Sequence, residues 1–339
     1  MIIDFNNTKN YCEAIFHIHQ DDVEKVAIEL FHYQFQNNSI YQRYCQALRV
    51  VPDQINTLHQ IPFLPISFFK THEVTTGNFT PAAVFESSGT TGTINSRHLV
   101  KDLGVYELSF LKAFRLFYGD PQQFCIIGLL PSYLERNNAS LVYMVDRLIK
   151  ESGHPQSGFY LNEYNKLHQT LLQNEKAGIQ TLLIGVTFAL MDFFSEYPMQ
   201  LENTVIMETG GMKGRRAEMT KTELQHFLSQ QSGVTKIHSE YGMTELLSQG
   251  YSFGDGLFNT PPWMRILLRA EDNPLETWSL DFTTQDHYRG VVNVIDLANI
   301  HSCAFIATED RGKVYMNGHF EILGRMDNSD VRGCSQMVL

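Results

Sequence analysis

Cysteines are few in this sequence, and no two of them lie close together in the chain. The five cysteines are odd in number and far apart, and no C-x-x-C motif occurs; they are Cys12, Cys45, Cys125, Cys303 and Cys334. Neither a disulfide framework nor a zinc site is indicated, because each needs paired or clustered cysteines. The pattern is typical of a reducing compartment, and we expect a cytoplasmic protein.

Long apolar runs and an excess of positive charge are also missing. No stretch approaches the ~18 apolar residues of a membrane-spanning helix, and the start MIIDFNNTKNYCEAIF lacks the basic and apolar regions of a secretion signal. The chain has 37 acidic and 26 basic residues, a formal net charge of −11. This balance works against binding to nucleic acid or to an anionic membrane, because both depend on attraction to phosphates.

What the sequence does contain is an ordinary globular composition. Apolar residues make up 43% and charged residues 19% of the 339 positions, so a sizeable core can be buried and general disorder is excluded. Changes of pattern divide the chain into residues 1–80, 81–260, 261–324 and 325–339. The first segment is predicted to be a helical lead-in packed on the core, since residues 21–58 show helical spacing until Pro52, Pro62 and Pro65 break it.

Residues 81–260 alternate between short apolar runs and amphipathic segments. The runs FCIIGLL (124–130), TLLIGV (181–186) and TVIM (204–207) predict buried strands, while residues 103–117 and 141–148 have helical spacing. Strands that alternate with helices favour an α/β fold with a mostly parallel sheet.

After Thr260 the helical signal fades, and a smaller β-rich part is predicted. The runs WMRILLRA, GVVNVID and CAFIAT are typical of strands. The segment KVYM-Asn317-Gly318-HFEI predicts a hairpin with a type I′ turn, because that turn needs two residues that tolerate positive φ.

The densest group of small polar residues is Glu86-Ser87-Ser88-Gly89-Thr90-Thr91-Gly92-Thr93, after the predicted strand AAVFE. Glycines let successive backbone N–H groups turn toward one anion, and hydroxyls add donors. We interpret the group as a phosphate-binding loop, with a polar surface turn as the alternative. It is not a Walker A loop, since G-x-x-x-x-G-K-[ST] does not occur.

A second group, Ser239-Glu240-Tyr241-Gly242-Met243-Thr244-Glu245, follows the plausible strand VTKIH. Open α/β sheets bind their ligands at the carboxyl ends of strands. Tyr241 can stack on a base there, Thr244 can donate to a phosphate, and Glu245 can hold Mg²⁺, which prefers one or two carboxylates together with phosphate oxygens. The alternative is a helix start with an acidic first turn.

The third group is Thr308-Glu309-Asp310-Arg311-Gly312, followed beyond the hairpin by Gly324-Arg325-Met326-Asp327-Asn328-Ser329-Asp330-Val331-Arg332-Gly333. An aspartate at a strand end suits the two hydroxyls of a ribose, because a carboxylate accepts both.

One further motif is rejected. The segment Gly250-Tyr251-Ser252-Phe253-Gly254 matches the G-x-S-x-G of serine hydrolases. A nucleophile elbow needs a helix after the serine, whereas the loop sequence DGLFNTPP follows here.

Taken in order, SSGTTG, YGMTE, TED and GRMDNSDVRG resemble the core motifs of the adenylate-forming superfamily of acyl and aryl ligases, which activate carboxylates as acyl-AMP. The segments LPISFFKTHEV, ESSGTTGTINSRH, LLPSYLERNNASL and the RGC ending are similar to the LuxE-type acyl-protein synthetases, the fatty-acid-activating component of bacterial luminescence systems. The resemblance implies the large domain of these enzymes, with mostly parallel α/β sheets and a β-rich subdomain.

The resemblance also implies a role for each matching residue. Ser87 to Gly92 would wrap the ATP phosphates, with Thr91 at the β/γ part. Gly210 and Gly211 would lie against adenine, with Tyr241 and the adjoining Gly242 on its other side. The remaining assignments are Thr244 to the α-phosphate, Glu245 to Mg²⁺, Asp310 to the ribose, Arg325 to ribose or phosphate, and Asp327 to a hinge that opens the tail 325–339.

Two departures from the superfamily pattern bear on catalysis. Its Pro-Lys after the phosphate loop is replaced by Ile94-Asn95-Ser96-Arg97, so Arg97 or His98 is expected to supply the positive charge. Most relatives continue into a small C-terminal domain with a catalytic lysine, whereas this chain stops six residues after Gly333. The fold is therefore expected to lack that domain.

The implied function is activation of a fatty or other carboxylic acid as acyl-AMP, with ATP and Mg²⁺, followed by acyl transfer to a thiol. The resemblance places that thiol at Cys334, near Arg325 and Arg332, for delivery to an acyl reductase or carrier protein. Tyr133, Arg136 and Asn137 are expected to face the substrate carboxylate, although Arg136 fits a surface ion pair equally well. Two other functions stay open: a ligase that delivers to coenzyme A or a carrier protein, and a nucleotide-binding protein without turnover.

Overall fold

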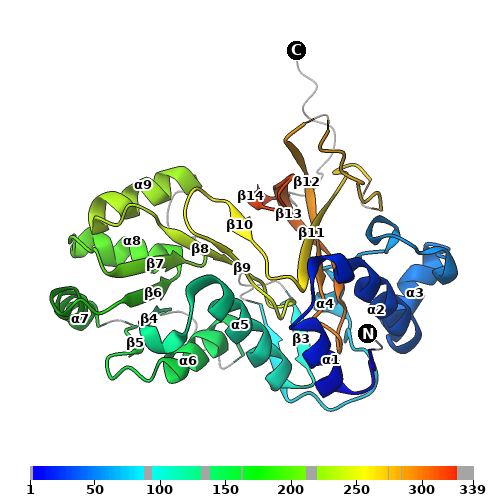
Figure 1. Ribbon diagram of the computed structural model, residues 1–339, viewed down its shortest axis with the longest axis horizontal. Helices are drawn as coiled ribbons and strands as arrows, with labels where there is room; N and C mark the ends of the chain where they lie inside the picture. The colour runs from blue at the N-terminus through cyan, green and yellow to red at the C-terminus, as the bar shows by residue number, and fades with distance from the viewer. Residues whose placement is uncertain are drawn as a thin grey trace.

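The computed structural model describes residues 3–87, 94–130, 138–161, 163–210, 220–273, 275–283 and 285–326. They form one large sheet flanked by helices, and a separate two-stranded sheet (Figure 1). The helices are α1 (Thr8–Ile15), α2 (Val23–Asn37), α3 (Ser39–Ala47), α4 (Phe68–Thr71), α5 (Leu103–Tyr118), α6 (Ser140–Ser152), α7 (Tyr164–Ala177), α8 (Thr187–Glu196) and α9 (Lys221–Ser232). The strands are β1 (Leu64–Pro65), β2 (Ala83–Glu86), β3 (Arg97–Val100), β4 (Cys125–Leu129), β5 (Gly158–Phe159), β6 (Thr181–Gly185), β7 (Thr204–Glu208), β8 (His238–Tyr241), β9 (Gly250–Ser252), β10 (Phe258–Asn259), β11 (Met264–Arg269), β12 (His287–Asp296), β13 (Phe305–Tyr315) and β14 (Phe320–Arg325).

The large sheet joins a parallel half to an antiparallel half. Its strand order is β11-β12-β13-β14-β10-β9-β8-β7-β6-β4-β5, and β1 pairs with β13. The pairs among β8, β7, β6, β4 and β5 are parallel, whereas the pairs from β8 through β9 to β11 are antiparallel. The predicted α/β fold with a β-rich part is confirmed, and both parts share one sheet.

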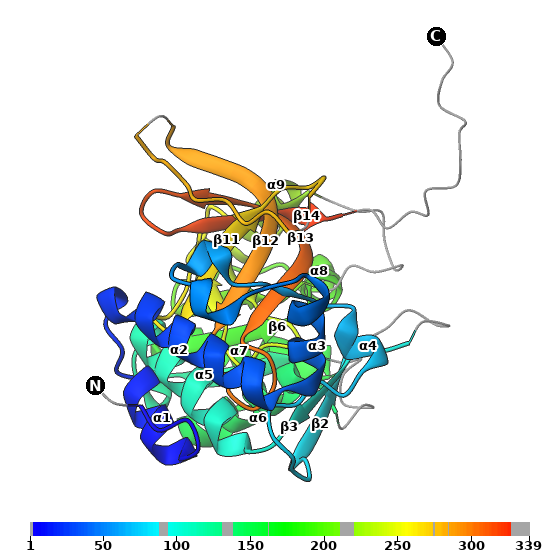
Figure 2. The same cartoon turned by 90° about the vertical axis from the view of Figure 1, so that its right-hand side faces the viewer.

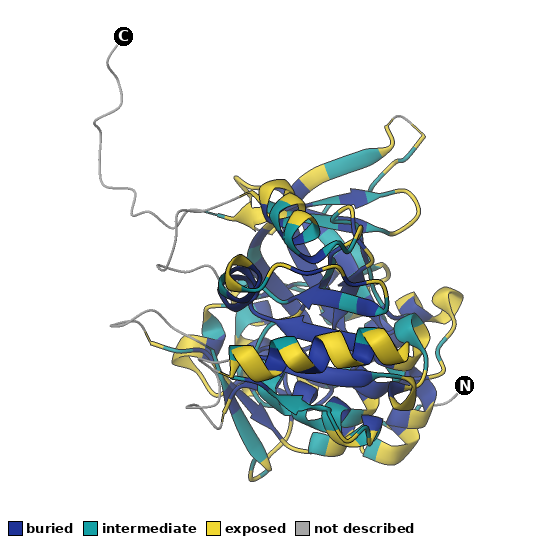
Figure 3. Ribbon diagram, turned by 90° about the vertical axis from the view of Figure 1, so that its left-hand side faces the viewer, coloured by how far each residue is buried: buried dark blue, intermediate teal, exposed yellow. Residues whose placement is uncertain are grey.

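Helices cover both faces of the parallel half, with α5 and α6 below the strands in Figure 1 and α8 and α9 above them. Every residue of β4 and of β6 is buried. Figure 3 shows the same division, with exposed helix faces outside and buried strands behind them. Strands covered on both faces have continuous apolar sequences, which is why these two were visible in the sequence.

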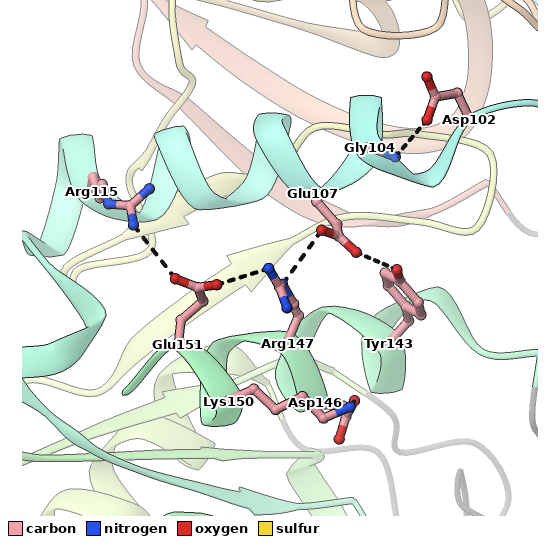
Figure 4. Close-up of polar contacts among 9 residues, drawn as sticks. All are labelled: Asp102, Gly104, Glu107, Arg115, Tyr143, Asp146, Arg147, Lys150 and Glu151. Atoms are coloured by element: carbon pink, nitrogen blue, oxygen red, sulfur yellow. Dashed lines mark hydrogen bonds and ion pairs between the residues drawn. The ribbon is translucent and has the colours of Figure 1, made fainter. Parts of the chain in front are cut away.

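An alternating row of charges joins α5 to α6 (Figure 4). The Arg147 side chain lies 3.4 Å from Glu107 and 2.9 Å from Glu151, and Glu151 lies 3.8 Å from Arg115. The Tyr143 hydroxyl donates to Glu107 at 2.5 Å. The row links α6 to α5 through side chains that remain partly exposed.

Helices α1, α2 and α3 cover the side of the molecule that faces the viewer in Figure 2. The fully buried Gln34 of α2 ties this layer to the turn between β12 and β13. Its amide nitrogen donates to the carbonyls of residues 299, 300 and 302, and its oxygen accepts the N–H of Ala304 at 2.9 Å. Helices α1, α2 and α3 lie within the predicted lead-in, and Asn38 separates α2 from α3: its side chain accepts the Tyr41 N–H and caps α3.

The hairpin at Asn317-Gly318 forms, but the predicted type I′ turn is wrong. Gly318 has a φ of 82°, whereas Asn317 is absent from the residues with positive φ in the described part of the chain. The Gly318 N–H donates to the Tyr315 carbonyl, and Asn317 uses its side chain to accept the His319 N–H. This is a type I turn followed by a left-handed glycine, the usual three-residue hairpin loop.

Within the described ranges, none of the helices combines the length and the apolar character that a bilayer-spanning segment requires.

Candidate active site

The carboxyl ends of the parallel strands meet at one edge of the sheet, where open α/β sheets bind ligands. Gly210 follows β7 at this edge with a φ of 76°. Its N–H donates to the Glu208 carboxylate at 2.8 Å, and its carbonyl accepts the Thr187 N–H. A Cβ placed on Gly210 would meet no atom of the described residues within 4 Å, so these residues leave one side of the turn open. The neighbouring Gly211 lies outside the described residues.

Tyr241, Asp310 and Arg325 come together beside this edge. The Tyr241 hydroxyl donates to Asp310 Oδ2 at 2.9 Å, and Arg325 Nε lies 3.4 Å from Asp310 Oδ1. The last two residues are register partners in β13 and β14. Burial raises the pKa of Tyr241 well above its ordinary value, and the nearby Asp310 raises it further, so the phenol stays a donor.

Two predicted strand boundaries were wrong in this region. Strand β8 begins at His238, so Ser239 to Tyr241 lie within it and pair with β9 instead of following a strand. Asp310 lies inside β13, next to a register shift between β13 and β14 at Arg311 and Gly312, and not at a strand end. The Tyr241 hydroxyl of β8 nevertheless reaches Asp310 of β13.

Residues 242–249 carry Thr244 and Glu245 and form no helix. The Thr244 carbonyl accepts from His98 Nδ1 at 2.9 Å. The Glu245 side chain is buried, and this burial raises its pKa. A hydrogen bond from Ser96 and the charges of Arg325 and Lys70 act in the opposite direction and favour the carboxylate.

A buried carboxylate that the sequence did not single out holds this irregular segment in place. Asp296 is fully buried, and its oxygens accept the N–H groups of Leu247 and Ser248 at 2.8 and 3.0 Å. They also accept the Ser248 hydroxyl at 2.6 Å and the Ala298 N–H at 3.1 Å. Glu245 is fixed as well, because its carbonyl accepts the Asn299 amide at 2.8 Å.

The β2–β3 hairpin holds the two ends of the predicted phosphate loop together. The Ser96 N–H donates to the Ser87 hydroxyl at 2.9 Å, and the Ser87 N–H donates to the Ser96 carbonyl at 3.1 Å. Arg97 pairs with Glu86 in the register, and its exposed guanidinium lies 3.9 Å from Glu73. His98 faces inward instead, and burial lowers its pKa to about 4, so it is neutral at pH 7.

Several predicted site residues lie outside the described part of the chain. They are Ser88, Gly89, Thr90, Thr91 and Gly92 of the loop, Gly211, the substrate candidates Tyr133, Arg136 and Asn137, and Cys334. The structure brings together Tyr241, Asp310 and Arg325, and it places Gly242, Thr244 and Glu245 directly after β8.

Ser252 of the rejected G-x-S-x-G motif is fully buried in β9, and its hydroxyl donates to the Gly254 carbonyl at 2.9 Å. This geometry agrees with the rejection of a serine hydrolase. The described residues also contain no group of three or more His, Cys, Asp or Glu side chains that could hold a metal ion by themselves.

Comparison with known proteins identifies the family. The family model "Acyl-protein synthetase, LuxE" matches residues 17–339. The long-chain-fatty-acid–luciferin-component ligase of Aliivibrio fischeri is 25% identical over 344 residues, covering 92% of this chain and 86% of that protein. Both findings confirm the resemblance inferred from the motifs.

The structure is also similar to the crystal structure of ATP-bound MatB from Rhodopseudomonas palustris, with a TM-score of 0.52 and 16% identity. The match covers 72% of this chain and 48% of MatB, so this chain spans about half the length of that protein. The expected fold, that of the large domain of adenylate-forming enzymes, is confirmed. The chain therefore belongs to the LuxE family of acyl-protein synthetases.

Proposed function

We propose that this protein activates a fatty or other carboxylic acid as acyl-AMP at the expense of ATP and then transfers the acyl group to a thiol. The family match supports this reaction, and so does the fatty-acid ligase name of the A. fischeri relative. The observation that carries the proposal is the Tyr241–Asp310–Arg325 group beside the open turn at Gly210.

In this proposal three parts of the chain hold the nucleotide. Asp310 accepts the ribose hydroxyls, with Tyr241 and Arg325 fixing its two oxygens. The backbone at Gly210 and Gly211 lies against one face of adenine, which fits the open side of the Gly210 turn. Ser87 to Gly92 surround the phosphates, and the paired backbones of Ser87 and Ser96 fix both ends of that loop.

Glu245 fits the single protein carboxylate of a nucleotide-bound Mg²⁺, an ion that takes its other ligands from phosphate oxygens and water. Its burial raises the pKa, and a cation beside it would favour the ionised form. When bound, Mg²⁺ neutralises charge on the phosphates. Thr244 is the proposed contact of the α-phosphate.

The first step joins two anions, so the site must supply positive charge and orientation. A carboxylate oxygen of the acid attacks the α-phosphorus, the bond to the bridging oxygen breaks, and pyrophosphate leaves. Arg325 and Lys70 are the cations that act on Glu245. Arg97 stands at the base of the phosphate loop, whereas neutral His98 is not suited to this role. We place Tyr133, Arg136 and Asn137 at the acid.

In the second step a thiolate attacks the acyl carbonyl, a thioester forms, and AMP leaves. We propose Cys334, on the hinge-like tail 325–339, as this thiol and an acyl reductase or carrier protein as the next acceptor. The four described cysteines are unsuitable because all of them are buried. We also propose a cytoplasmic location, which the odd number and wide spacing of the cysteines favour.

The test is to mix the protein with Mg-ATP and a series of fatty acids, without coenzyme A, and to measure the intact mass of wild type and Cys334→Ser. An acyl adduct on wild type that is absent from the variant is the expected result. No adduct on either protein, with pyrophosphate still exchanging into ATP, would move the acceptor to coenzyme A or a carrier protein. No exchange with any acid would favour a nucleotide-binding protein without turnover.

A further inference from the structure

One face of the β8–β9 pair carries polar side chains that have no partner among the described residues. Glu240 of β8 lies opposite Tyr251 of β9 in the register. The Tyr251 hydroxyl and the side-chain oxygen of Gln249 are both buried, and neither makes a hydrogen bond within the described structure. The exposed fractions of these two residues are 1% and 4%.

Glu240 reaches toward the ligand edge of the sheet. A Cβ placed on Gly242 would lie 2.4 Å from Glu240 Oε1 and 3.4 Å from Gln249 Cγ. Both side chains therefore gather beneath Gly242, which is exposed where β8 ends. Tyr241, a residue of the proposed nucleotide site, lies between Glu240 and Gly242 in the chain. The polar group of Glu240 and Gln249 therefore adjoins that site.

No described side chain donates a hydrogen bond to the Glu240 carboxyl group. Three tyrosines surround it, and its charge adds to the raised pKa that burial gives each of them. Tyr106 donates to the Ser140 carbonyl at 3.1 Å, and the Tyr118 hydroxyl pairs with His238 Nδ1 at 3.1 Å. The Tyr251 hydroxyl, by contrast, has no hydrogen-bond partner among the described residues.

The surroundings favour the neutral form of Glu240. Burial and, to a lesser extent, the negative charge of Glu208 raise the pKa of Glu240 to about 8. A neutral carboxyl group, an amide oxygen and a phenol are well suited to a polar group that donates and accepts hydrogen bonds. They are poorly suited to an alkyl chain, because a buried polar group left unpaired costs about 1–3 kcal/mol.

We propose that Glu240, Gln249 and Tyr251 bind a hydroxyl or amino group carried on the chain of the acid that this enzyme activates. The inference rests on the proposed function and narrows its substrate class to substituted acids. A site that hydrogen-bonds one substrate group discriminates strongly against the analogue that lacks it.

The test measures acid-dependent pyrophosphate exchange with decanoic acid and its 2-hydroxy, 3-hydroxy, 10-hydroxy and 10-amino derivatives. Wild type is expected to use at least one substituted acid with a kcat/KM about 30-fold or more above that of decanoic acid. Comparison of the 10-hydroxy and 10-amino acids then separates hydroxyl binding from amine binding. Glu240→Leu is expected to reduce that ratio at least tenfold. Glu240→Gln, which keeps the size of the side chain, should lower it by a smaller factor. Glu29→Gln, on the surface of α2, should leave the ratio unchanged.

Equal or better use of decanoic acid by wild type, unchanged in both Glu240 variants, would overturn the inference while leaving acyl activation intact. Exchange with none of the acids would instead overturn the proposed function, and the inference with it.

Discussion

At the scale of single residues, Asp310 is the group on which nucleotide binding depends. Asp310→Asn keeps the size of the side chain but removes the charge that pairs with Arg325. We expect AMP to bind about 10- to 100-fold more weakly, because hydrogen bonds to a charged acceptor are worth about 1.5–3 kcal/mol. Isothermal titration calorimetry measures this change.

Tyr241→Phe is the matched control, since it removes one donor to Asp310 and leaves the carboxylate. Its loss of affinity should be less than that of Asp310→Asn. Wild-type affinity in both variants would contradict a ribose-binding role for Asp310.

Asp296 is predicted to be the main structural carboxylate of the site. Asp296→Asn places an amide among donors from Leu247, Ser248 and Ala298, so at least one of them loses its acceptor. We expect the free energy of unfolding to fall by about 2–4 kcal/mol. Urea denaturation checks this value, with the exposed Asp146→Asn as the control. An unfolding midpoint equal to that of wild type would argue against the role assigned to Asp296.

At the scale of elements, Gln34 holds α2 on the β12–β13 turn. Gln34→Leu is similar in size but leaves three carbonyl contacts and the Ala304 N–H without a partner. A loss of about 2–4 kcal/mol in the free energy of unfolding is expected. Gln46→Leu, at an exposed position of α3, serves as the control. If both variants unfold at the same urea concentration, the buried amide does not anchor the helices.

The ion pairs between α5 and α6 should contribute much less to the free energy of unfolding. Arg147→Met keeps most of the length of the aliphatic stem and removes two ion pairs, yet the Arg147 side chain is 39% exposed. We expect a loss of no more than about 0.5 kcal/mol, which disappears in high salt. Lys150→Met removes one neighbouring surface pair and should have no measurable effect. A larger, salt-independent loss for Arg147→Met would show that the row is effectively buried.

At the scale of the whole molecule, two buried histidines and one half-buried histidine make the fold sensitive to acid. Burial lowers the pKa of His98, His238 and His301 to about 4. The unfolded chain binds protons near pH 6.5, so the stability these groups contribute is present above that pH and is lost as the pH falls toward 4. His98→Gln should reduce the loss of stability between pH 7 and pH 5 by up to about 2 kcal/mol. An unchanged pH profile would show that His98 is protonated in the fold.

The sequence predicts those elements whose own residues show a clear pattern. It does not predict features that depend on pairing with residues elsewhere in the chain or on side-chain hydrogen bonds. The strands β4 and β6 were predictable because they are buried on both faces and therefore apolar throughout. The start of β8 was missed because its residues are polar and pair with β9, which follows later in the chain. The Asn317-Gly318 turn was misassigned because a local hydrogen bond to the asparagine side chain favours another turn type.

The same distinction applies to the site. Tyr241, Asp310 and Arg325 stand in short ordered motifs and could be named from the resemblance. Asp296 stands in no such motif, and Lys70 and Ser96 lie in segments that carried the resemblance but were given no role of their own. All three interact at the site with residues distant in the chain, Asp296 with Leu247 and the other two with Glu245. Glu240 was part of a motif, but its lack of a partner depends on the packing of α5 and β9 against β8.

The most direct test of acyl activation is exchange of labelled pyrophosphate into ATP in the presence of a carboxylic acid. We predict that exchange by wild type requires both the acid and Mg²⁺, and that Asp310→Asn reduces its rate at least tenfold. Exchange without any added acid, or exchange unaffected by the loss of the Asp310 charge, would contradict adenylation at this edge of the sheet.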